Sequence, residues 1–227
     1  MLVSLFFFWF LFCLLRVKVE THQEDLEMWI PIVLHGDGAD VHRRRSFDVV
    51  TMSSACTSGS PFDTKILIYC MDNSRATAET FDVLNSWVVW SLTELQEGKW
   101  MSVDPWNRPL KRRHSGDAVA GGFRGVLVQL KGDEKWLQKT LKLVPSGVSH
   151  WVCPICRACK DGHLVYTTHG PNAPHRQTRL TTVEFINEAS RGGPWIRLPG
   201  FSVQLLAFDW LHLVDLAIIP ECVASAP

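Results

Sequence analysis

The stretch GVLVQLKGDEKW, residues 125–136, decides which fold this sequence is expected to adopt. Residues of buried-strand character lead into Lys131 and Gly132. The acidic pair Asp133 and Glu134 follows, and a helical pattern begins immediately afterwards. A carboxylate at the end of a buried strand either caps the following helix or binds a metal ion. Whether Asp133 caps a helix or binds a metal ion depends on which other residues the fold brings beside it.

Three more strands and one more helix are predicted before that stretch. The strands are expected at 29–40, 46–54 and 64–71, and the helix at 76–98. A second helix, residues 133–143, follows the stretch itself. In the second strand, Phe47, Val49 and Thr51 alternate with Asp48 and Val50, which predicts a half-buried strand.

The resulting order is strand, strand, strand, helix, strand, helix, which is the order of a ribonuclease H-like core. The predicted fold class is therefore α/β, with a ribonuclease H-like mixed sheet and flanking helices in residues 28–145. A small Cys/His-rich segment and a C-terminal helix are expected in residues 146–227.

Two acids stand at the ends of strands that such a sheet would place side by side. Asp37 lies in a Gly-Asp-Gly sequence that ends the first strand, and Asp133 ends the fourth. Two facing carboxylates can hold Mg²⁺ or Mn²⁺, and a pair of such ions can activate water against a phosphodiester. Gly36, Gly38 and Gly132 would let a phosphate backbone approach. The structural alternative is that Asp37 is a turn residue and Asp133 only a helix cap.

A second candidate site lies in HWVCPICRACKDGHLVYTTHGPNAPH, residues 150–175. Cys153 and Cys156 have the spacing of a zinc knuckle. The residues that can complete a tetrahedral zinc site are Cys159, His163, His169 and His175. The alternative is that these cysteines are small core residues without a metal.

The charge balance excludes a global basic field, because Lys+Arg and Asp+Glu both total 23. Local basic loops remain as candidate contacts to a DNA backbone: Arg43, Arg44, Arg45, Lys111, Arg112 and Arg113. The alternative is that both runs are solvated turns.

Residues 1–20 form an apolar leader whose first fifteen residues, MLVSLFFFWFLFCLL, are too few to cross a bilayer comfortably. The leader is either signal-like, which would direct the chain to the secretory pathway or a membrane, or the product of a wrong start site. The chain contains no Asn-x-Ser/Thr acceptor, which argues against export.

Three segments together resemble the catalytic region of cut-and-paste DNA transposases of the CACTA and Plavaka kind. These are GDEKWLQKTLKL, then HWVCPICRAC, and later FDWLHLVDLAI. The resemblance covers about residues 29–224 in order and spacing, and implies that Asp37 and Asp133 are the first two catalytic, metal-binding acids. It also implies Mg²⁺ or Mn²⁺ as cofactor, DNA as partner and a nuclear location. Self-association is a further expectation.

The resemblance assigns Cys153, Cys156, Asp209 and His212 to the family's insertion motifs. Cys159 and His163 remain zinc candidates from their spacing to the cysteine pair. The family's third acid, a Glu after the insertion, is expected beyond Pro227, and Glu221 comes too early to replace it. The expectation is therefore a truncated or degenerate transposase that is catalytically incomplete. The alternative function is a zinc-stabilised interaction module without nucleic-acid activity.

Overall fold

A computed structural model of the chain describes residues 27–42, 45–111, 115–143, 150–168, 170–188 and 193–208. The apolar leader and the insertion pair Asp209 and His212 lie outside these ranges, as does Glu221. The same holds for His169 and for most of the predicted phosphate contacts, namely Arg43, Arg44, Arg112, Arg113 and the side chain of Arg45.

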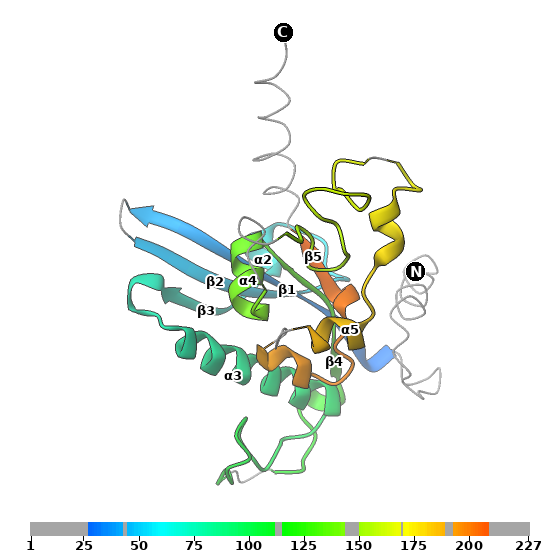
Figure 1. Cartoon of the computed structure of the whole chain (residues 1–227). Coiled ribbons are helices and arrows are strands. Elements are labelled where there is room, and N and C mark those ends of the chain that lie inside the picture. Colours follow the sequence, from blue (N-terminus) through cyan, green and yellow to red (C-terminus); the bar gives the residue numbers. More distant parts are fainter. Residues whose placement is uncertain are drawn as a thin grey trace.

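A five-stranded mixed sheet forms the centre of the molecule (Figure 1). Its strands are β1 (Trp29–His42), β2 (Arg45–Ser54), β3 (Ile66–Asp72), β4 (Arg124–Gly132) and β5 (Leu206–Phe208), in the order β3-β2-β1-β4-β5. The pairs β1/β2 and β2/β3 are antiparallel, whereas β1/β4 and β4/β5 are parallel. The α/β prediction with a mixed sheet is confirmed.

The described helices lie in the connections between β2 and β5. The α-helices are α2 (Pro61–Thr64), α3 (Ala78–Glu97), α4 (Glu134–Leu141) and α5 (Thr182–Asn187). The 3₁₀ helices are η2 (Asn73–Arg75), η3 (Ala120–Gly122), η4 (Pro174–Thr178), η5 (Gly193–Arg197) and η6 (Val203–Leu205). The two predicted helices thus correspond to α3 and α4.

Local sequence explains where α3 begins and ends. The Thr77 side chain accepts a hydrogen bond from the Thr80 amide, and the Thr80 side chain accepts one from the Thr77 amide, which is a capping box. Gly98 ends the helix with a left-handed φ of 69°, a conformation in which glycine carries no Cβ penalty.

β1 is longer than the sequence predicted. We expected a strand over 29–40 with Asp37 as its ending acid, but β1 pairs with β2 as far as His42, whereas its pairing with β4 stops at Gly36 opposite Gly132. The reason is that β1 belongs to two ladders, and only the parallel one ends beside the acid. Asp37 is therefore a strand residue and not a turn residue.

The glycines beside the acids serve packing. A Cβ at Gly36 would lie 1.9 Å from Cε2 of Trp136, and a Cβ at Gly132 would lie 2.6 Å from Cε3 of the same indole. The expectation that Gly36 and Gly132 leave room for a phosphate backbone is therefore wrong, because the α4 tryptophan fills that space. At Gly38 a Cβ would make only ordinary contacts.

One buried cluster joins the sheet to segments from both halves of the chain. Leu34, Leu130 and Trp136 are at most 1% exposed, and Phe185 and Trp195 are fully buried in the same cluster. Residues on both sides of position 145 thus share one core.

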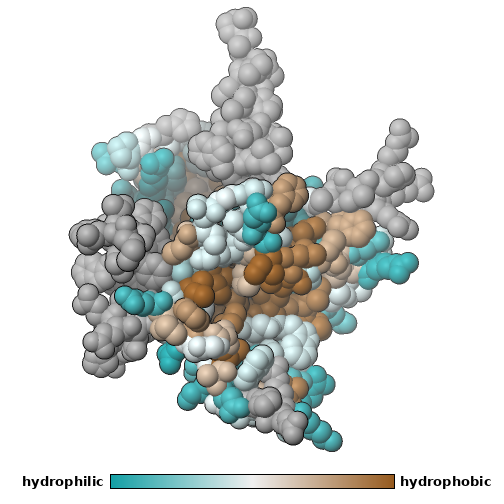
Figure 2. All heavy atoms as spheres, turned by 180° about the vertical axis from the view of Figure 1, so that it is seen from behind, coloured by the Kyte–Doolittle hydropathy of each residue, from teal (hydrophilic) through white to brown (hydrophobic). Residues whose placement is uncertain are grey.

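The face of the sheet opposite α3 and α4 has a different character. Seen from behind, the molecule shows hydrophobic side chains gathered across its centre (Figure 2). Exposed apolar residues also occur on α2 and on both faces of the edge strand β3, namely Phe62, Ile66, Leu67 and Ile68. Within the ranges that the structure describes, none of the helices combines the length and the apolar character needed to cross a bilayer.

Candidate functional site

Asp133 divides its two carboxylate oxygens between two neighbours. Oδ1 accepts a hydrogen bond of 2.6 Å from the Trp136 amide and caps α4. Oδ2 lies 3.9 Å from the position that a Cβ would occupy at Gly38 in β1. The capping role is therefore real, and it leaves the second oxygen directed towards β1.

Asp37 is brought beside Asp133 by the parallel ladder. The last pair of that ladder is Gly36 opposite Gly132, and the two acids are the next residues on their strands. Neighbouring strands lie about 4.8 Å apart, so the two backbones are adjacent at this edge. Asp37 is half-buried. Because Gly36 and Gly38 face α4 and Asp48, alternation along β1 directs the Asp37 side chain to the opposite face.

Asp48 is a third acid at this place, and the sequence interpretation did not select it. It pairs with Gly38 across the β1/β2 ladder, and its Oδ1 lies 3.6 Å from the Cβ position of that glycine. Asp48 is only 1% exposed. Asp48 and Asp133 therefore lie on the two sides of Gly38.

Two donors hold the buried Asp48 carboxylate. Asn73 Nδ2 donates to Oδ1 at 2.9 Å, and Lys139 Nζ lies 3.1 Å from Oδ2. This arrangement ties β2 to η2 and to α4. Removing the charged partner of a buried carboxylate destabilises the fold, because the remaining charge is left uncompensated. We therefore assign Asp48 a structural role.

The donor set suits a hydrated ion better than a closed site. No group of three or more His, Cys, Asp or Glu side chains within the described ranges is arranged to hold a metal ion. Mg²⁺ in proteins commonly keeps several waters and uses only one or two carboxylates. Asp37 and Asp133 are two carboxylates at this edge, but they leave the sheet towards opposite faces, so a single ion could contact both only beyond the last pair of the ladder. Asp48 is already paired with Lys139.

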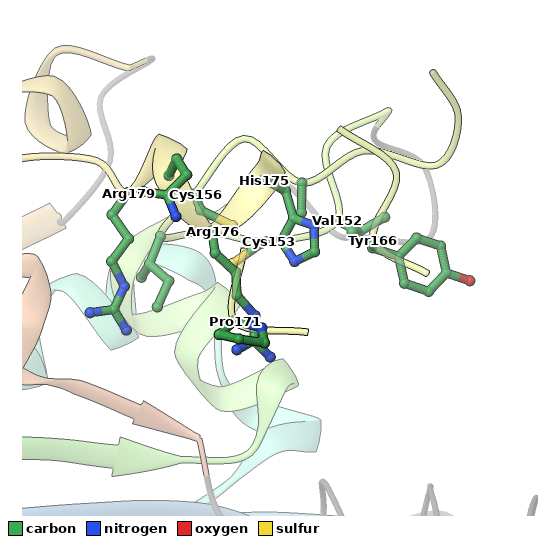
Figure 3. A pocket seen from close by; sticks show the side chains of 11 residues that line it. Val152, Cys153, Cys156, Tyr166, Pro171, His175, Arg176 and Arg179 are labelled. Atoms are coloured by element: carbon green, nitrogen blue, oxygen red, sulfur yellow. The ribbon is translucent and has the colours of Figure 1, made fainter. Parts of the chain in front are cut away.

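The Cys/His segment forms a separate pocket of about 580 Å³. Cys153, Cys156 and His175 line it together with Tyr166 and two arginines (Figure 3). Burial raises the pKa of the Cys153 thiol to about 11, and the adjacent Cys156 thiol contributes to the rise. Without a bound metal ion, Cys153 is therefore a protonated thiol at neutral pH.

The other two predicted zinc ligands lie elsewhere. Cys159 is 4% exposed, and its Sγ donates to the Asp161 carbonyl at 2.8 Å. His163 is exposed, and neither residue lines the pocket. Spacing alone did not show that the more distant His175 shares a pocket with the cysteine pair.

The predicted phosphate contacts remain largely outside the described ranges. Lys111 has a described side chain, and it is exposed. Exposed basic side chains at other positions, Arg176 and Arg179, line the pocket beside the cysteines.

Comparison with known proteins adds no assignment. The chain matches no family model, no curated protein and no solved structure. Function therefore has to be argued from the sheet edge and the cysteine pocket themselves.

Proposed function

We propose that this chain is a transposase-derived fragment with a ribonuclease H-like core, related to metal-dependent DNA strand cleavage and transfer. The observation that carries the proposal is the β1/β4 register, in which Asp37 and Asp133 directly follow the pair Gly36 and Gly132. The mixed sheet with its first and fourth strands as neighbours supports the same interpretation.

In this proposal the two acids hold one Mg²⁺ or Mn²⁺ ion at the carboxyl end of β4, beyond the pair Gly36 and Gly132, where a hydrated ion can be reached from both faces of the sheet. Such an ion, when bound, supplies Lewis-acid stabilisation of a phosphate oxygen. Asp133 contributes Oδ2, because its Oδ1 is occupied by the α4 cap. Trp136 packs against Gly36 and Gly132 and so holds the start of α4 against β1 and β4. This packing keeps Asp133, the N-cap of α4, in place.

We further propose that the chain alone does not cut DNA. Transfer of a phosphodiester by the two-metal route needs two ions in fixed geometry, and Asp37 and Asp133 together provide protein ligands for one. Asp48 cannot serve a second ion while Lys139 and Asn73 occupy its oxygens. Salt-sensitive binding to DNA in the nucleus requires only charge and is compatible with this arrangement.

The test measures Mn²⁺ binding to the full chain and separates capping from metal binding. Asn caps helices as well as Asp, so Asp133→Asn keeps α4 while removing one charge. We expect Asp133→Asn and Asp37→Asn each to weaken Mn²⁺ binding at least about tenfold, which corresponds to about 1.4 kcal/mol. Asp63→Asn, at an exposed acid in α2, is the matched control and should have no effect.

Two results would contradict the proposal: no Mn²⁺ binding by the unaltered chain, or binding that neither Asp37→Asn nor Asp133→Asn changes. Specific nicking of a labelled duplex with Mn²⁺ would contradict only the proposed inactivity. The cysteine pocket favours a second function, a zinc-stabilised interaction module. That function becomes the better description if the chain binds zinc but neither Mn²⁺ nor DNA.

A further inference from the structure

The cysteine pocket is built from two segments that backbone bonds hold together. Residues 153–156 contribute the two thiols, and η4 contributes His175. Cys156 forms a β-bridge with Arg179, and the Leu180 amide donates to the Ile155 carbonyl at 3.0 Å. Leu180 belongs to the central core cluster. The thiols and the imidazole are therefore neighbours by construction of the fold.

A threonine completes the connection between the two segments. The Arg157 amide donates to Thr178 Oγ1 at 3.0 Å, and that hydroxyl donates to the His175 carbonyl at 2.6 Å. The main chain of His175 is thus fixed relative to the residue that follows Cys156. Only the side-chain torsions of His175 remain to decide where its ring points.

The ring of His175 has an unmet requirement. Its Nδ1 is buried and has no hydrogen-bond partner among the described residues. A buried polar nitrogen without a partner costs about 1–3 kcal/mol, so such atoms usually have a ligand or a water. In Figure 3 this ring lies in the same pocket as the two sulfur atoms.

We infer that Cys153, Cys156 and His175 form a zinc site with three protein ligands and a fourth position open to water. Zn²⁺ takes thiolate sulfur and neutral imidazole nitrogen in tetrahedral geometry, and an open fourth position is common when three protein ligands are present. The three side chains line one pocket without yet surrounding one point, so the thiols and the ring must rotate towards the ion.

The charges of the pocket agree with this ligand set. Two thiolates and a neutral imidazole together balance the charge of Zn²⁺. Arg176 and Arg179 line the same pocket, and a neutral metal complex does not repel their guanidinium groups. A harder cation such as Mg²⁺ prefers carboxylate oxygens, and no Asp or Glu is among the described residues that line this pocket.

The site goes beyond the proposed transposase function, since it needs neither Asp37 nor DNA, and it rests on the second function proposed above, the zinc-stabilised module, whose ligands it names. Its effect would be to hold residues 150–168 against η4 through a metal as well as through backbone bonds. Binding energy at such sites is also folding energy, so this segment should tighten when zinc binds.

The experiment measures zinc content and Co²⁺ binding in the full chain. We expect one zinc per chain by elemental analysis, and thiolate-to-metal charge-transfer absorption on Co²⁺ addition. Cys153→Ser and Cys156→Ser should abolish this absorption. His175→Gln should weaken zinc binding by more than about 10–100-fold, the range seen when only an outer-shell partner is removed.

Cys159→Ser and His163→Gln are the matched controls, because they remove a thiol and an imidazole that lie outside the pocket. Both should keep full zinc binding. Circular dichroism of each variant distinguishes ligand loss from unfolding, and a chelator titration of the unaltered chain gives a readout that needs no variant. The inference is overturned if the unaltered chain binds no zinc or Co²⁺, if His175→Gln leaves zinc affinity unchanged, or if Cys159→Ser abolishes binding.

Discussion

The sheet edge and the cysteine pocket place their functional side chains by different means. At the sheet edge, a parallel ladder with one register shift, between Ile32 and Val33, ends at Gly36 and Gly132 and so brings Asp37 beside Asp133. In the pocket, single β-bridges and a few side-chain bonds hold His175 beside the cysteines. Regular ladders propagate position over many residues, whereas isolated bonds fix only their own neighbours. Changes at the sheet edge should therefore have global effects, and changes at the pocket should have local ones.

The largest effect is expected from filling the space under the α4 tryptophan. Gly36→Ala places a Cβ 1.9 Å from Trp136 Cε2, so the indole or the strand must move. We expect the free energy of unfolding to fall by about 3 kcal/mol, at the upper end for overpacked cores. Urea denaturation measures the loss.

Gly38→Ala is the control for that change, because it adds the same methyl group to the same face of β1. Its nearest contacts would be Asp48 Oδ1 at 3.6 Å and Asp133 Oδ2 at 3.9 Å, which are ordinary distances. We expect a change below about 1 kcal/mol. Equal losses in the two variants would show that the indole does not determine the packing here.

The next effect comes from the buried carboxylate of β2. Lys139→Met removes the cation 3.1 Å from Asp48, whose side chain is 2% exposed, and leaves that carboxylate with Asn73 alone. Loss of one partner of a buried pair costs about 3–5 kcal/mol, and we expect about 2 kcal/mol because Lys139 is 42% exposed.

Lys142→Met provides the comparison on the neighbouring turn. Lys142 pairs with Asp82 at 2.7 Å, and both side chains are well exposed. Exposed pairs contribute about 0–1 kcal/mol, so the expected change in unfolding free energy is small. If both lysine variants lose the same stability, burial of Asp48 is not the reason for the loss.

The sequence predicted the strands and the helix of the sheet edge better than it predicted which of their side chains are buried. Alternation and cap residues indicated β2, β4 and α4, because these signals depend on near neighbours. The side of β2 that faces the core was not evident. Asp48 and Val50 are each 1% exposed, while Phe47, Val49 and Thr51 are half-buried on the other face.

Burial of Asp48 could not be predicted because its partner Lys139 lies on α4, far along the chain. An aspartate is rarely buried unless it is paired, and the pairing appears only when the helix packs on the sheet. The same reason explains the pocket. The knuckle spacing of Cys153 and Cys156 is local, but His175 reaches them through the bridge between Cys156 and Arg179.

A pH dependence provides a further probe of packing at the sheet. Burial raises the pKa of Tyr69 to about 12 from its usual 10.0, and the nearby charge of Asp48 adds to the rise. The unfolded chain therefore loses this proton first, and the stabilisation present below pH 10 is lost as pH rises to about 12.

The measurement compares unfolding free energies of the unaltered chain and Tyr69→Phe between pH 9 and about 12. Lysine deprotonation affects both proteins, so it cancels in their difference. Between pH 9 and about 12, we expect the unaltered chain to lose about 2 kcal/mol more of its unfolding free energy than Tyr69→Phe loses. Tyr166→Phe, at an exposed tyrosine, should follow the unaltered chain at every pH. A flat difference for Tyr69→Phe would show that this hydroxyl is solvated.

The smallest global effect is expected at the hydroxyl that joins the two sides of the pocket. Thr178→Val keeps the shape of the side chain but removes the acceptor for the Arg157 amide and the donor to the His175 carbonyl. Two such bonds contribute about 1 kcal/mol each, but opening of this segment does not unfold the sheet, so the global free energy should change by less than about 1 kcal/mol. Hydrogen exchange at residues 151–166 should nevertheless accelerate several-fold, while exchange in β1 and β4 stays unchanged.

Thr167→Val, at an exposed threonine in the same segment, is the control and should alter neither the global free energy of unfolding nor the exchange rates. Faster exchange in β1 after Thr178→Val would mean that the pocket and the sheet edge open as one unit, and the contrast between a ladder and isolated bonds would then not describe this molecule.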